Sequence, residues 1–128
     1  MKSLNVAIFG CGTVGGGVAQ IISEINKDLN IRADKNIVLK KIVEIYPQVA
    51  AKRFNIPLDV FCGGGKDLSK DEAGQYIQEI ISSDEIDLVV ETMGGTSDFV
   101  FNTCLSVVKA GKHLVTANKA LLAERGLS

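Results

Sequence analysis

The stretch VAIFGCGTVGGGVAQII, residues 6–22, decides the fold of this 128-residue chain. It opens with a short apolar run, passes through glycines at 10, 12 and 15, and continues into a predicted helix. The apolar face predicted for this helix is formed by Val14, Val18, Ile21, Ile22 and Ile25. An apolar run ended by glycine is typical of a strand buried on both faces of a parallel sheet. The glycines spell GxGxxG between this predicted strand, residues 4–9, and a predicted helix, residues 13–29.

Each glycine of the pattern has its own physical role. Gly10 allows a tight turn, Gly12 lets the backbone approach a pyrophosphate without a Cβ in the way, and Gly15 lets the helix pack close to the strand. The free N–H groups of the first helical turn, with the positive end of the helix dipole, offer an anion site. We therefore predict a dinucleotide, NAD or NADP, at this turn. Gly16 and Gly17 exceed the pattern and each costs a helix about 1 kcal/mol relative to alanine, so we expect something to pack closely there.

The rest of the chain alternates between strands and helices. The patterns predict further strands over residues 36–45, 58–61, 86–91 and 112–117, and helices over residues 47–54, 71–83, 97–111 and 118–128. Such alternation forces parallel pairing with right-handed crossovers. The predicted fold is α/β, a Rossmann-like doubly wound parallel sheet with helices on both faces, forming one dinucleotide-binding domain over residues 1–128. Sheets of this kind bind ligands at the carboxyl ends of their strands.

Composition and charge exclude several classes of protein. Hydrophobic residues make up 46% and charged residues 23%, and no apolar run approaches the roughly 20 residues that cross a bilayer, so we expect no membrane partner. A net charge of -1 gives no basic patch for nucleic acid. Three widely spaced cysteines and one histidine argue against a disulfide framework and a zinc site, so we expect no metal and a reducing cytoplasm.

Glu44, near the end of the second predicted strand, is the candidate acid for the adenosine ribose hydroxyls, which would favour NAD. Glu44 lies farther from the glycines than the usual ~20 residues, and strand alternation leaves open whether it or Tyr46 faces the ribose. Lys52 and Arg53 are the cations that could reach a 2′-phosphate. The choice between NAD and NADP is therefore left open. For Cys11, at the predicted helix N-terminus, a small packing role is favoured over a redox role with a lowered thiol pKa.

Two later strand ends also carry functional side chains. In DLVVETMGG, residues 87–95, Glu91 and Thr92 end an apolar strand, and the glycine pair that follows would let the chain pass close under a nicotinamide ribose or diphosphate. A plain capped turn is the alternative there. In HLVTANK, residues 113–119, Asn118 can cap the last helix, so Lys119 falls in a first turn where its charge opposes the helix dipole. An anionic or carbonyl substrate would explain that lysine, and simple solvent exposure is the alternative. His113 begins its strand at the opposite edge, so we expect a structural role.

The segments FGCGTVGGGVAQII, VVETMGG and AGKHLVTANKALLA together resemble the nucleotide-binding domain of homoserine dehydrogenase in order and spacing. The block at residues 110–123 is the most specific, because the related sugar-dehydrogenase-like family has Glu-Lys-Pro where this chain has Ala-Asn-Lys. The likeness departs at the second strand, where many family members place an arginine for NADP and this chain has residues 44–46, EIY, and in the inserted-looking loop 62–74.

The resemblance implies reversible hydride transfer between NAD(P)H and aspartate 4-semialdehyde, giving homoserine on the route to threonine and methionine. It assigns the pyrophosphate to the glycine turn, the nicotinamide end to later strand ends, and catalysis to Lys119, beside the nicotinamide. The turn residues are Gly10, Gly12, Thr13, Val14 and Gly15, and the nicotinamide residues are Thr92, Gly94, Thr116 and Asn118.

The resemblance also implies that the family's subunit is longer, with a substrate-binding sheet, dimer contacts, a second catalytic lysine and an acidic partner that these residues lack. We therefore expect a homo-oligomer when full length, and expect residues 1–128 alone to bind a dinucleotide weakly or not at all and to turn over no homoserine. Because Met1 stands a few residues before the first strand, with no signal-peptide pattern, we expect no upstream fusion. A different small-molecule reductase and a non-catalytic NAD(H)-sensing module are the alternatives.

Overall fold

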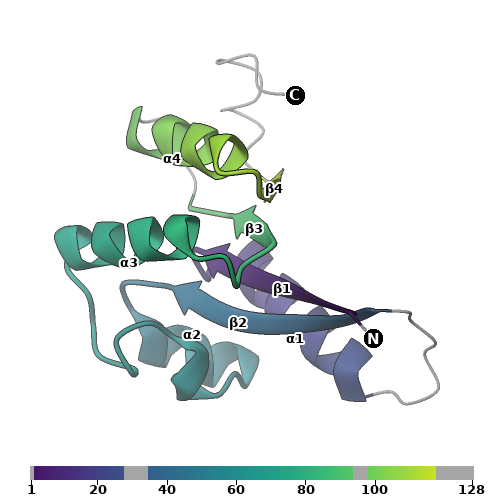
Figure 1. The fold of residues 1–128 in the computed structure, drawn as a ribbon. Helices are drawn as coiled ribbons and strands as arrows, with labels where there is room; N and C mark the ends of the chain where they lie inside the picture. Colours follow the sequence, from purple (N-terminus) through teal and green to yellow (C-terminus); the bar gives the residue numbers. More distant parts are fainter. Residues whose placement is uncertain (1, 28–34, 94–97, 118–128) are drawn as a thin grey trace.

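The computed structural model describes residues 2–27, 35–93 and 98–117, and it shows a parallel sheet between two layers of helices (Figure 1). The sheet order is β2-β1-β3-β4. Its strands are β1 (Lys2–Phe9), β2 (Lys35–Val43), β3 (Leu88–Glu91) and β4 (His113–Thr116). All three pairings are parallel, and the register sets Phe9 beside Val43 on one side and beside Glu91 on the other. The carboxyl ends of the strands therefore meet at one edge of the sheet.

The helices divide between the two faces of the sheet. The helices α1 (Thr13–Lys27) and α2 (Pro47–Phe54) cover one face, and α3 (Lys70–Ser82) and α4 (Asp98–Lys109) cover the other (Figure 1). Alternate residues of β1 feed the two cores: Val6 and Ile8 pack with α1 and α2, whereas Ala7 and Phe9 pack with α3 and α4. This arrangement confirms the predicted doubly wound α/β fold.

Local sequence explains where the helices on either side of the loop 55–69 begin and end. Pro47 lies in the first turn of α2, and Asn55 ends that helix in the left-handed conformation with φ 54°. At α3, the Ser69 hydroxyl accepts a hydrogen bond from the Glu72 amide and the Glu72 carboxylate accepts one from the Ser69 amide. This reciprocal capping box fixes the start of α3.

The structure corrects two predictions. The strand predicted over residues 58–61 is instead a short 3₁₀ helix, η1 (Leu58–Val60), joined to the sheet by one bridge between Ile42 and Phe61. The apolar face predicted for the first helix is narrower than expected, because Val14 and Ile21 are 52% and 59% exposed while Ile22 is buried. The helix predicted over residues 118–128 lies outside the described residues. In the described part of the chain no helix is both long and apolar enough to cross a membrane.

Candidate dinucleotide site

The turn after β1 is built by glycines that the fold uses in different ways. Gly10 has φ +87°, a conformation that side chains strongly disfavour, and its amide donates to the Val43 carbonyl at 2.8 Å. A Cβ on Gly15 would lie 2.3 Å from the Gly10 carbonyl oxygen, so only glycine lets α1 pack this closely. A Cβ on Gly12 would meet nothing within 4 Å. Gly10 and Gly15 are therefore required by the fold itself, and Gly12 is not.

The start of α1, at the carboxyl edge of the sheet, is open to solvent. The first hydrogen bond of α1 runs from the Gly16 amide to the Gly12 carbonyl at 2.8 Å, so the preceding amides have no helical carbonyl to which they can donate. Gly12, Thr13 and Val14 are exposed, and the first turn of α1 contains no acidic residue. Together these features give the turn the geometry and polarity of an anion site.

Glu44 lies beside the same turn. The sequence left open whether Glu44 or Tyr46 faces the ribose. One oxygen of its carboxylate accepts from the Cys11 amide at 2.7 Å, and the other accepts from the Tyr46 amide at 3.0 Å. The Tyr46 side chain is 57% exposed. Between the two candidates for the ribose, the structure therefore sets Glu44 against the glycine turn, one residue beyond the end of β2.

Thr92 joins the turn after β3 to the turn after β1. Its amide donates to the Phe9 carbonyl at 2.9 Å, and its hydroxyl donates to the Gly10 carbonyl at 2.5 Å. Between β1 and β3 the strand order reverses, and in doubly wound sheets this switch point is where ligands bind. Thr92, predicted for the nicotinamide end, is thus in contact with Gly10 of the turn predicted for the pyrophosphate.

Glu91 is a functional candidate that the sequence placed at the end of a strand without indicating a role for it. It ends β3 fully buried, with no exposed surface. Its carboxylate accepts from the Thr116 hydroxyl at 2.5 Å and from the Met93 amide at 2.6 Å, and so ties β4 to the turn after β3. The sequence signal for this role was the acid that directly follows three apolar strand residues. An acid at such a position is buried with the strand, and a buried acid needs hydrogen-bonding partners.

Arg53 also reaches the site. It lies in the last turn of α2, and its Nη2 donates to the Thr13 hydroxyl at 3.1 Å. The approach depends on Gly16, because a Cβ there would come within 2.2 Å of the Phe54 ring. The close packing expected at Gly16 is confirmed, whereas a Cβ on Gly17 would meet nothing within 4 Å and that expectation is wrong.

The cysteine of the turn is a packing residue. Cys11 is buried, and burial, with a smaller contribution from the Glu44 carboxylate, raises the pKa of its thiol to about 11. A helix N-terminus alone would lower this pKa, so desolvation dominates. The redox alternative for Cys11 loses its basis.

The remaining predicted site residues are placed as follows. Thr116 is half-buried at the end of β4, on the same edge as the glycine turn. His113 begins β4 at the opposite edge, as expected. Gly94, Asn118 and Lys119 lie outside the described residues, so their roles stay predictions.

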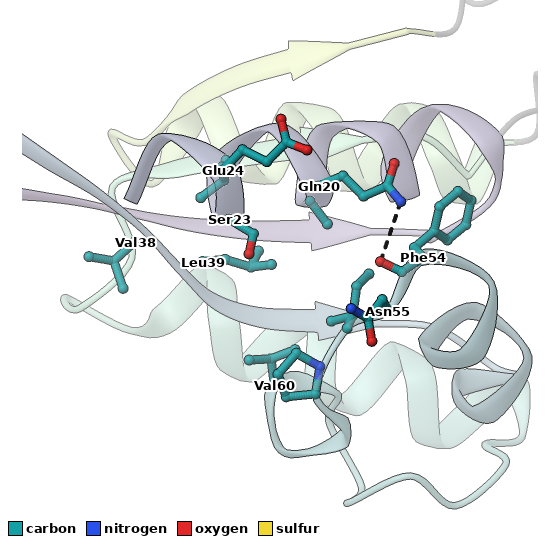
Figure 2. A pocket seen from close by; sticks show the side chains of 12 residues that line it. Gln20, Ser23, Glu24, Val38, Leu39, Phe54, Asn55 and Val60 are labelled. Carbon is teal, nitrogen blue, oxygen red and sulfur yellow. Dashed lines mark hydrogen bonds between the residues drawn. The ribbon is translucent and has the colours of Figure 1, made fainter. Parts of the chain in front are cut away.

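An open groove of about 420 Å³ lies on the α1 face, between α1, β2 and residues 54–60 (Figure 2). Figure 2 shows Gln20 of α1 donating to the Phe54 carbonyl along its rim. Among its lining residues the charged one is Glu24, an acid. This groove is therefore unsuited to a phosphate, and the glycine turn remains the candidate site.

A doubly wound parallel sheet with an open, amide-rich glycine turn at its switch point defines a dinucleotide-binding domain. Comparison with known proteins specifies the family. Residues 10–128 match the family described as homoserine dehydrogenase, NAD binding domain. The chain belongs to this family, and its cofactor is accordingly NAD(P), as the glycine turn predicted.

Individual relatives agree. The chain is 35% identical over 126 residues to homoserine dehydrogenase of Pseudomonas aeruginosa, covering 98% of this chain and 25% of the relative. It is 32% identical over 127 residues to that of Methylobacillus glycogenes, covering 96% and 26%. Its fold matches the crystal structure of a homoserine dehydrogenase from Thiobacillus denitrificans with a TM-score of 0.70 and 28% identity, over 98% of this chain and 26% of that one. The chain thus spans about a quarter of the length of the curated relatives it matches.

Proposed function

We propose that this chain is the nucleotide-binding part of a homoserine dehydrogenase, which reversibly reduces aspartate 4-semialdehyde to homoserine with NAD(P)H. The observation that carries the proposal is the open space at Gly12. Glycine is not needed there for packing, since a Cβ would meet nothing within 4 Å. At a helix N-cap a side chain that accepts a hydrogen bond is at least as stable, so the absence of a side chain is best explained by a ligand that approaches the backbone.

The proposed roles follow the positions of the residues along the carboxyl edge. The amides near Gly12, Thr13 and Val14 hold the diphosphate, with Gly10 and Gly15 shaping the turn. The Glu44 carboxylate accepts hydrogen bonds from two backbone amides, and its remaining lone pairs can accept from ribose hydroxyls. A carboxylate there repels a 2′-phosphate, which supports NAD over NADP.

At the other end, Thr92, Thr116, Gly94 and Asn118 are proposed to line the nicotinamide. When bound, NAD(P) supplies the ring that donates or accepts hydride. Lys119 is proposed to polarise the aldehyde oxygen and to stabilise the negative charge that develops there. Supporting this placement, β4 ends at Thr116 on the ligand edge, and Lys119 follows it closely in sequence.

The proposal includes a small-molecule substrate and a homo-oligomer for the full-length enzyme, with the substrate-binding part outside these residues. It also includes a location in the cytoplasm. The non-catalytic NAD(H)-sensing module is not favoured, because the curated relatives that cover the chain are named as dehydrogenases. Turnover of homoserine by the intact gene product, followed by NAD(P)H absorbance, distinguishes the two: a sensor binds the cofactor without turnover.

The binding site is tested by Gly12→Ala, with Gly17→Ala as the matched control because both Cβ atoms enter open space. In the intact gene product we expect Gly12→Ala to raise the Kd for NADH by about tenfold or more, since the methyl group occupies the path of the diphosphate. Its free energy of unfolding should fall by about 1 kcal/mol or less, which is the cost of alanine at a helix N-cap. Gly17→Ala should leave the Kd unchanged. Calorimetric titration gives the Kd of each variant, and equal affinity for NADH in Gly12→Ala and the parent protein would refute the site.

A further inference from the structure

The guanidinium of Arg53, an exposed residue, makes two contacts beside the glycine turn. Its Nη2 donates to the hydroxyl of Thr13, the first residue of α1, at 3.1 Å. The guanidinium carbon also lies 4.8 Å from the centroid of the Phe54 ring, a cation–π distance. The side chain therefore extends from the last turn of α2 to the start of α1.

This placement depends on packing that the GxGxxG pattern does not require. Phe54 fits against α1 only because residue 16 is glycine, and the Gln20 amide donates to the Phe54 carbonyl at 3.4 Å (Figure 2). Gly16 lowers the stability of α1, but it lets the C-terminal end of α2 pack against the first turns of α1. This packing places Arg53, in the last turn of α2, beside Thr13 at the ligand edge of the sheet.

The charge of Arg53 has no acid to balance it in the described part of the chain. The ion pairs there are Lys40–Glu85 and Lys66–Glu72, and Arg53 takes part in neither. Its hydrogen bond to a described residue goes to a neutral hydroxyl, whereas a guanidinium carries five N–H donors. The carboxylate of Glu44 is bonded to backbone amides. A cation with spare donors thus stands beside the turn amides.

We propose that Arg53 is a phosphate-binding residue of the dinucleotide site, and that its guanidinium binds the diphosphate shared by NAD and NADP. Planar guanidinium donors suit phosphate oxygens, and a fixed position on the Phe54 ring lowers the entropy lost when they bind. The inference rests on the proposed function, because it needs the diphosphate to lie over the Gly12 turn. It assigns Arg53 to affinity and not to the choice between the two cofactors.

The test compares Arg53→Gln with Lys52→Gln, which removes the same charge from the neighbouring exposed position of α2. In the intact gene product we expect Arg53→Gln to raise the Kd of ADP-ribose by about tenfold and to leave that of adenosine, which has no phosphate, unchanged. Lys52→Gln should change neither by more than about twofold. Arg53→Lys, which keeps the charge and loses the planar fork, should fall between the parent and Arg53→Gln. Unfolding midpoints by circular dichroism check that all variants are folded.

Three results would overturn the inference. The first is an ADP-ribose affinity in Arg53→Gln equal to that of Lys52→Gln. The second is a loss confined to NADPH, which would mean that Arg53 contacts a 2′-phosphate. The third is an equal loss for adenosine, which would mean a structural role. If Gly12→Ala weakens binding and Arg53→Gln does not, this inference fails alone; if neither does, the proposed site itself fails.

Discussion

The turns after β1 and β3 lie side by side at the sheet edge and handle polar groups in opposite ways. After β1, the residues Gly12, Thr13 and Val14 are exposed and their amides are not used by the helix. At the end of β3, the polar group is Glu91, fully buried and bonded to Thr116 and to Met93 of the turn that follows. The first turn keeps its hydrogen-bonding capacity for a ligand, and the second uses it to hold the sheet together.

The difference shows which residues are expected to act on binding and which on stability. An exposed donor costs little to leave unpaired, because water satisfies it, so it is available to a ligand. A buried carboxylate without partners is costly, so its partners are fixed in the native state. Substitutions in the first turn should therefore change affinity, and substitutions at the second turn or at the junction should change the free energy of unfolding.

The largest expected effect breaks the junction between the turns. In Gly15→Ala the new Cβ would lie 2.3 Å from the Gly10 carbonyl oxygen and 2.6 Å from the Thr92 hydroxyl. Because backbone must move, we expect the free energy of unfolding to fall by about 3 kcal/mol or more. Gly17→Ala, in the same helix with open space around its Cβ, should instead gain about 0.5–1 kcal/mol. Urea unfolding measures both, and two variants of similar stability would contradict the packing described.

The second effect tests the buried turn. Glu91→Gln keeps the shape of the side chain but replaces one accepting oxygen by a donor facing Thr116 or Met93. We expect a loss of about 1–2 kcal/mol of unfolding free energy. Glu79→Gln, at an exposed position of α3, is the control and should change it by less than about 0.5 kcal/mol. A loss in the control as large as in Glu91→Gln would remove the special position of Glu91.

The smallest expected effect concerns two buried cysteines, Cys11 in the turn after β1 and Cys104 of α4, whose thiol interacts with Glu91. Burial raises the pKa of Cys11 and of Cys104 to about 11, with further contributions from Glu44 and Glu91, respectively. A raised pKa means less thiolate, so both thiols should react with iodoacetamide far more slowly at pH 8.5 than they do in the unfolded chain. Glu44→Gln removes a negative charge and should lower the pKa of Cys11 alone. Mass spectrometry of alkylation against pH measures this shift, and a native Cys11 as reactive as an unfolded thiol would contradict its burial.

Much of the fold could be predicted because it is encoded locally. The α2 bounds match the predicted range of residues 47–54, since proline and the asparagine at residue 55 mark its ends. The strand predicted at residues 58–61 was wrong because an apolar run becomes a parallel strand only where a neighbour offers a full edge, and here a single bridge to Ile42 forms.

By itself the sequence determined the parallel α/β order, the glycine turn at the first strand end and the family, because hydrophobic period, turn chemistry and motif spacing are properties of short segments. Tertiary structure alone decided that Gly12 opens to empty space while Gly15 does not, that Glu91 is buried against Thr116, and that Arg53 meets Thr13 across 40 positions of chain. The physical reason is that burial, close contact and hydrogen bonding depend on which distant segments fold together, and spacing along one chain does not record that.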